Sequence, residues 1–105
     1  MPFPRSLRGF LGGALLINAI PHGYHGLTGK PFPSPFATPP GVGNSEPPAN
    51  LAWSAVNVAA SHLLGGRRGG VRPSLASVIA GASVMAVVLA WWFGPEGPAA
   101  PSKRR

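Results

Sequence analysis

The chain lacks cysteine altogether and has only two acidic residues among its 105. Without cysteine there is no disulfide, no thiolate metal site and no cysteine nucleophile. The two acidic residues, Glu46 and Glu96, lie outside the apolar segments of the chain. A proton-coupled exporter usually needs an acid at membrane depth, so the sequence argues against that class of transporter. The apolar segments also lack the paired carboxylates that acid–base hydrolysis requires.

Sequence motifs of catalysis are missing as well. There is no G-x-S-x-G nucleophile elbow and no dinucleotide fingerprint, and the run GLTGKP (26–31) lacks the spacing of a phosphate-binding loop. We therefore predict that the protein is not an enzyme, with no catalytic residue, no metal site and no cofactor.

Charged residues make up only 10% of the chain, against roughly 25% in typical soluble domains. That is little charge for the surface of a small soluble protein, so the deficit indicates a membrane protein. The net charge of +7 also suits nucleic-acid binding, but most basic residues flank apolar segments, where they act as topology signals. We expect a lipid bilayer as partner and no nucleic acid. The flanking residues are Arg5, Arg8, Arg67, Arg68, Arg72, Lys103, Arg104 and Arg105.

The strongest apolar segment covers residues 75–93 (LASVIAGASVMAVVLAWWF) and contains neither charge nor proline. At about 1.5 Å per residue, a helix of this length nearly spans a hydrocarbon core of about 30 Å. Trp91, Trp92 and Phe93 close the segment, as the aromatic belt of a membrane helix does. We predict a transmembrane helix here.

A shorter and more polar segment covers residues 51–65, with Asn50 as its predicted N-cap. Its length fits a weak transmembrane helix or an interfacial one. Asn57, Ser61 and Gly65 recur every four residues, so small and polar positions share one stripe. Such a stripe favours packing against another helix, and we predict a second transmembrane helix.

The first apolar segment extends from about residue 7 to 27 and contains Pro21. Neighbouring helices make a proline tolerable in a membrane helix, and Gly9 and Gly13 form a G-x-x-x-G face for close approach. We predict a retained transmembrane helix. The alternative is a signal peptide cleaved after Ala19, although an isoleucine occupies the position where a small residue is preferred.

Residues 28–50 contain seven prolines, which predict an extended loop with polyproline-like stretches. The tail (94–105) is predicted to be disordered and basic. The expected fold is all-α: a single membrane unit (1–105) of three transmembrane helices, at about 7–27, 51–65 and 75–93.

One run of residues resembles a known group of proteins. The run N-A-I-P-H (18–22), the loop FPSPFATPPGVG (32–43), and the spacing of Asn50, Trp53 and Asn57 carry the likeness. The chain resembles small bacterial integral membrane proteins of no assigned activity, over roughly residues 8–65. The resemblance implies a bacterial multi-pass membrane protein and no catalytic residue.

Polar side chains within the apolar segments are the candidate functional residues. Along a continuous first helix, Asn18, His22 and His25 share one face. His22 or His25 together with His62 would form a bis-imidazole haem site, a metal site or a quinone hydrogen-bond site. The competing interpretation places these rings at the membrane interface, with Asn18 and Asn57 in interhelical hydrogen bonds.

Small residues predict where the helices pack. Ala82, Ala86 and Ala90 recur every four residues, with Ser77 and Gly81 on an adjacent line. We expect a structural or accessory membrane protein that binds another membrane protein or itself. The alternative is a small redox or ligand-binding membrane subunit that uses the three histidines. The flanking arginines predict a cytoplasmic N-terminus in the cell membrane. The predicted packing set is Gly9, Gly13, Asn18, Asn57, Ser61, Ala82, Ala86 and Ala90.

Overall fold

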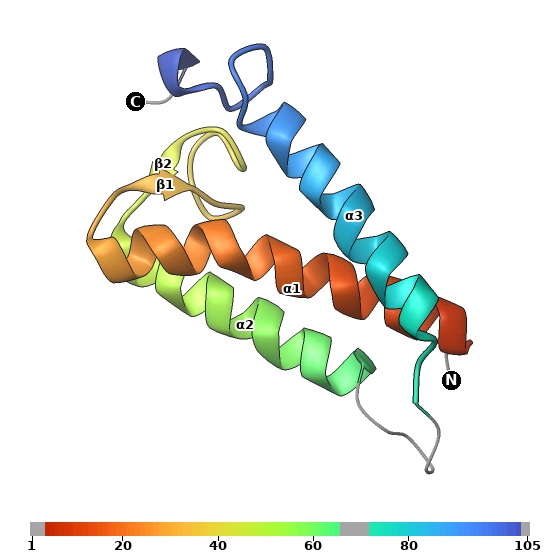
Figure 1. Cartoon of the computed structure of the whole chain (residues 1–105). Coiled ribbons are helices and arrows are strands. Elements are labelled where there is room, and N and C mark those ends of the chain that lie inside the picture. The colour runs from red at the N-terminus through yellow and green to blue at the C-terminus, as the bar shows by residue number, and fades with distance from the viewer. Residues whose placement is uncertain (1–3, 66–71, 104–105) are drawn as a thin grey trace.

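The computed structural model describes residues 4–65 and 72–103. This part of the chain contains helices α1 (Arg5–Thr28), α2 (Pro47–Gly65) and α3 (Leu75–Trp92), a two-stranded antiparallel ladder of β1 (Phe32–Pro33) and β2 (Asn44–Ser45), and a 3-10 turn (Pro101–Lys103). Figure 1 shows α1 and α2 side by side in opposite directions, with α3 crossing α1 near its N-terminus and then diverging. Four residues of the predicted topology signal lie outside the described residues: Arg67, Arg68, Arg104 and Arg105.

Helix α1 is the central helix, since it contacts both α2 and α3. It continues through Pro21, so the predicted first helix is one unbroken element. It ends where Gly29 adopts a left-handed φ of 72°, a conformation that glycine takes without the steric cost of a Cβ. There the amide of Lys30 donates to the carbonyl of His25 at 2.9 Å.

Helix α2 begins at Pro47, earlier than the predicted start at residue 51. Proline fits the first turn of a helix because its missing N–H would have no intrahelical partner there. Asn50 therefore lies inside the first turn rather than at the N-cap, and it is completely buried.

Only α3 is long and apolar enough to cross a membrane among the described residues, so the predicted fold of three transmembrane helices is wrong. Helix α1 has the length, but its C-terminal half carries Asn18 and two histidine rings. The hydropathy of α2 is lowered in the same way, because the helix contains two prolines, two asparagines and a histidine. The first segment was predicted to span because it reaches bilayer length and has a G-x-x-x-G face, and the second because its stripe of small and polar residues suits helix packing. An uncharged amide or imidazole is nevertheless costly in hydrocarbon.

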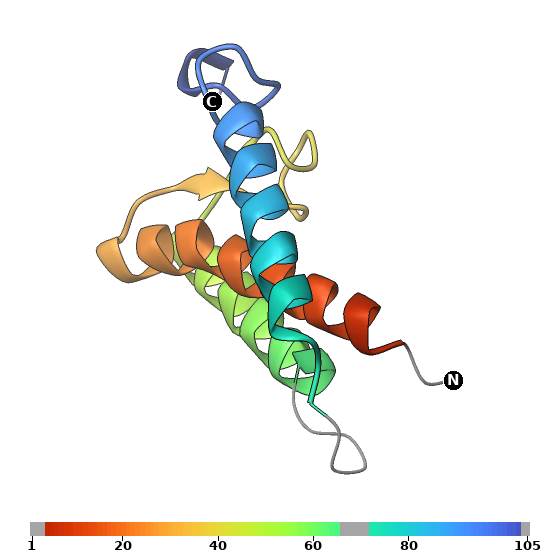
Figure 2. The ribbon, with the colours of Figure 1, turned by 45° about the vertical axis from the view of Figure 1, so that its right-hand side comes forward.

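The Pro-rich loop fills the space between α1 and the diverging end of α3, and Figure 2 shows it beside the C-terminal half of α3. Trp92 Nε1 donates to the carbonyl of Gly41 at 2.8 Å, and the rings of Phe32 and Phe93 lie 4.6 Å apart between centroids. The tail was predicted to be disordered, yet its described part folds back on α3. The Ala99 amide donates to the Trp92 carbonyl at 2.9 Å, and the Ala99 side chain is completely buried.

Candidate functional site

Four side chains of α2 form a polar seam against α1. Their spacing of four, three and four residues places them on one helical face. Ser61 Oγ donates to the carbonyl of Gly12 at 2.6 Å, and Ser54 Oγ donates to the carbonyl of Ala19 at 2.8 Å. Each bond ties α2 to a backbone oxygen of α1, so the seam fixes the register of the two helices. The polar seam consists of Asn50, Ser54, Asn57 and Ser61.

At the centre of the seam, two asparagines from different helices are paired. Asn18 Nδ2 donates to Asn57 Oδ1 at 3.1 Å, and Asn57 Nδ2 donates to the carbonyl of Trp53 at 2.8 Å. The second bond fixes the orientation of the Asn57 amide, because only the nitrogen can donate to a carbonyl. Asn57 is 1% exposed, so its side-chain amide is shielded from water.

Nearer the C-terminal end of α1, the seam closes on His22. Asn50 Nδ2 donates to the carbonyl of Phe32 at 2.8 Å and to that of Ser45 at 3.3 Å. Its Oδ1 therefore faces His22 Nδ1, at 2.7 Å. An amide oxygen can only accept, so His22 Nδ1 carries the proton. In the neutral ring the lone pair then lies on Nε2.

The surroundings of His22 favour this neutral form. Burial lowers the pKa of His22 below its ordinary value; the hydrogen bond to Asn50 raises it, and the neighbouring His25 lowers it further. The ring is 3% exposed and lies edge-on to the rings of Phe32 and Trp53, at centroid distances of 5.5 Å and 6.5 Å. His22 is therefore a neutral acceptor at pH 7.

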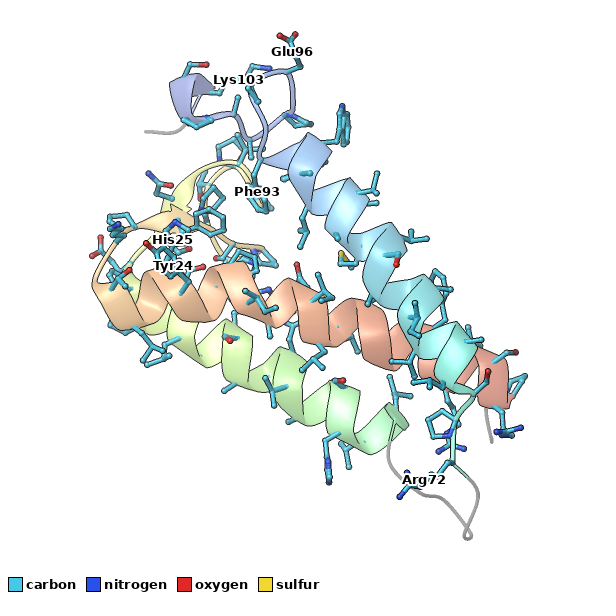
Figure 3. The ribbon with its side chains drawn as sticks, viewed as in Figure 1. Tyr24, His25, Arg72, Phe93, Glu96 and Lys103 are labelled. Atoms are coloured by element: carbon cyan, nitrogen blue, oxygen red, sulfur yellow. The ribbon has the colours of Figure 1, made fainter. Side chains whose placement is uncertain are left out.

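The other two histidines lie in different surroundings. His25 Nδ1 donates to the carbonyl of Pro21 at 2.7 Å, and its ring stacks on Phe32 at 3.8 Å between centroids. Figure 3 shows His25 near the C-terminal end of α1, on the side that faces the loop and Phe93. His62, in contrast, is exposed on α2.

The structure does not bring His22 and His62 together. His62 follows Asn50, the partner of His22, by three helical turns, or about 18 Å along α2 at 1.5 Å per residue. One iron or one metal ion cannot bridge that distance. The described residues contain no group of three histidine, aspartate or glutamate side chains that would hold a metal ion.

The α1–α3 contact runs through glycines. A Cβ on Gly81 would overlap the backbone of Phe10, and one on Gly13 would overlap the backbone of Val78. Ala82 is half-buried beside Gly13. The contact therefore follows the line of Gly81, which the sequence placed adjacent to the alanines.

Two members of the predicted packing set do not take part in this contact. Ala86 and Ala90 are exposed, because α3 leaves α1 after its first turns. Gly9, near the start of α1, does lie against α3: a Cβ there would meet the side chain of Ser77 and the carbonyl of Ser74.

A cavity of about 240 Å³ opens where α1, α3 and the loop diverge. Asn18 and His22 supply polar groups, and aromatic and aliphatic side chains supply most of the remaining wall. A second cavity of about 220 Å³ lies next to His62, between the N-terminal half of α1 and the end of α2. Sequence reasoning missed the first cavity and the His22–Asn50 pair. The four-three-four spacing back from Ser61 through Asn57 and Ser54 would have placed Asn50 on the same face of α2, but no sequence signal pairs it with His22.

The geometry is specific, but it carries no family assignment. The resemblance to small bacterial membrane proteins remains a prediction. The chain matches no protein-family model, no curated protein and no solved structure.

Proposed function

We propose that the protein is an accessory membrane component, anchored in the bilayer by α3, which acts by binding another membrane protein or a second copy of itself. One observation carries the proposal: α3 is uncharged and apolar, yet only 6% of it is buried inside the protein. Gly81 is its one buried residue. Large apolar side chains such as Ile79 and Val87 are 57% and 70% exposed, and burying such side chains away from water stabilises each by about 1.5–3 kcal/mol.

The placement of charge agrees with a membrane anchor. Figure 3 shows Arg72 beyond the N-terminal end of α3, with Glu96 and Lys103 beyond its C-terminal end. No charged side chain lies along the helix itself. Trp91 is 56% exposed at the C-terminal end, where membrane helices carry interfacial aromatic rings.

Partner binding is supported by the outward faces of α1 and α2. Leu16 and Ile20 of α1 are 49% and 61% exposed, and Val56 and Leu63 of α2 are 54% and 59% exposed. Large apolar side chains left exposed on two packed helices are available for a protein or membrane contact. These helices are too polar to be candidate spans, so a protein partner suits them better than lipid.

The anchor is tested by placing a charge at the centre of α3. Val84 and Leu16 are each 49% exposed, so Val84→Arg and Leu16→Arg are matched changes on different helices. Arginine at the centre of a membrane helix costs about 2.5–3.5 kcal/mol. We expect Val84→Arg to release the protein from membranes in an alkaline carbonate wash, while the wild-type chain and Leu16→Arg stay in the pellet. Release of the wild type, or equal release of both folded variants, would refute the anchor.

The partner is tested by crosslinking in native membranes followed by mass spectrometry. We expect crosslinks from α1 or α2 to one protein species or to a second copy of the chain. If the chain instead runs as an uncrosslinked monomer at every crosslinker concentration, the accessory role is wrong.

A further inference from the structure

The cavity between α1, α3 and the loop has a mostly apolar wall, into which Asn18, His22 and Ser34 bring polar groups. Ser34 Oγ already bonds to Ser45 Oγ and to the Phe36 amide. Met85, Val88 and Leu89 of α3 contribute aliphatic surface, while Trp53 and Trp92 contribute aromatic surface. Asn18 and His22 lie on α1, one helical turn apart. A few placed polar groups in an apolar wall are typical of small-molecule sites.

One of these polar groups is the second ring nitrogen of His22. Every side-chain polar atom that is sealed from solvent has a hydrogen-bond partner in the described part of the chain. Nε2 of His22 has no partner among the described residues, so it is not sealed, although the residue is 97% buried. Because His22 lines the cavity, its unpartnered Nε2 is assigned to that opening.

The chemistry of this nitrogen is fixed from the opposite side of the ring. Because Nδ1–H donates a 2.7 Å hydrogen bond to Asn50 Oδ1, Nε2 presents a lone pair and acts as a hydrogen-bond acceptor. The oxygen of Asn18 has the same character. Its amide nitrogen donates to Asn57, which leaves Oδ1 without a partner among the described residues. The cavity therefore offers acceptors to a ligand that brings a donor.

We propose that this cavity binds a small lipophilic aromatic alcohol, whose hydroxyl group donates a hydrogen bond to Nε2 of His22 while its rings lie against the aromatic and aliphatic wall. The cavity is large enough for a single ring or for two fused rings, since a cavity of about 150 Å³ accepts benzene and this one has about 240 Å³.

The proposal goes beyond the accessory role and does not depend on α3 as an anchor. It assigns the ligand chemistry to His22 alone among the three histidines. His25 uses its Nδ1 within α1 and stacks on Phe32, and His62 lies at the other cavity.

The test uses the full chain in lipid nanodiscs with 1-naphthol as probe and 1-methoxynaphthalene as matched control. Both probes carry two fused rings, but only the naphthol can donate a hydrogen bond. Nitrogen-15 spectra of the histidine rings follow binding directly, because the Nε2 signal of a neutral ring moves when it accepts a hydrogen bond. We expect 1-naphthol to shift Nε2 of His22 and leave His62 unchanged, with the methyl ether binding roughly two- to tenfold more weakly.

The variant His22→Asn tests the role of Nε2 as a hydrogen-bond acceptor separately from the role of His22 in holding the fold. Its amide nitrogen takes the place of Nδ1 beside Asn50, but nothing replaces Nε2. We expect this variant to bind 1-naphthol about as weakly as the wild type binds the ether. Equal affinity of the wild type for the two probes would overturn the proposal, as would a naphthol shift at His62 alone or the absence of any shift. The probe comparison on the wild type decides the matter even if the variant fails to fold.

Discussion

Replacing Asn50 with alanine should be among the most damaging single changes in this protein. Asn50 is 0% exposed and makes three hydrogen bonds, to His22 Nδ1 and to the carbonyls of Phe32 and Ser45. Alanine removes all three and leaves three polar groups without that partner. Each unsatisfied buried group costs about 1–3 kcal/mol, and relaxation toward water recovers part of this. We therefore expect a loss of about 3–5 kcal/mol in the free energy of unfolding.

The assay is thermal unfolding in detergent, followed by far-UV circular dichroism. For a chain of this size, 1 kcal/mol corresponds to about 4–8 °C in melting temperature, so Asn50→Ala should melt at least about 12 °C below the wild type. Asn44→Ala is the matched control, because Asn44 is exposed and nearby on β2. Surface changes of that kind stay within about 0.5 kcal/mol. If the two variants melt together, the hydrogen bonds of Asn50 do not hold the loop, α1 and α2 in place.

Three further predictions follow from the helix contacts, the buried histidine and the flanking charge. Gly81→Ala should destabilise the protein by about 1–3 kcal/mol through overpacking against α1. Gly65→Ala is the control and should not, because a Cβ at that position would meet open space. Equal melting temperatures of the two variants would contradict the glycine contact. Because burial lowers the pKa of His22 below 6.5, the unfolded chain binds the proton more readily. The His22 contribution to stability should then be complete above about pH 6.5 and be lost as the pH falls through the lowered pKa. Melting temperatures from about pH 7.5 downward should fall less steeply for His22→Asn, and parallel curves would remove His22 as the cause. With α3 as the anchor, the arginines just before it predict a cytoplasmic N-terminus, so alkaline phosphatase fused to the C-terminus should be active and a fluorescent protein fused there should be dark. The reverse pattern would mean the opposite orientation.

Apolar, nearly uncharged segments were a sound guide to the helices and a poor guide to their environment. The sequence predicted helices over 7–27, 51–65 and 75–93, and the structure has helices over Arg5–Thr28, Pro47–Gly65 and Leu75–Trp92. The prediction that all three cross a membrane was wrong. It weighed the absence of charge more than the amide and imidazole groups, which are also unfavourable in hydrocarbon.

The candidate site was predictable only in part, because hydrogen bonding depends on which faces meet. The sequence placed Asn18 and Asn57 on helical faces suited to packing, and the structure puts their amides 3.1 Å apart. It predicted Asn50 as the N-cap of the second helix. In the structure α2 begins earlier, at Pro47, and the Asn50 side chain is hydrogen-bonded to His22. No local pattern connects residues 28 positions apart.

The sequence by itself determined the helices, the one strongly apolar segment and the lack of cysteine, because composition and the distribution of apolar residues are local properties. Tertiary structure alone decided that α1 lies between α2 and α3, that glycines rather than Ala86 and Ala90 make the α1–α3 contact, and that the loop and tail fold against α3. It also decided the tautomer of His22. A lone pair comes to face a cavity only when an amide from another helix holds the opposite side of the ring, and that requires the distant segments to be packed together.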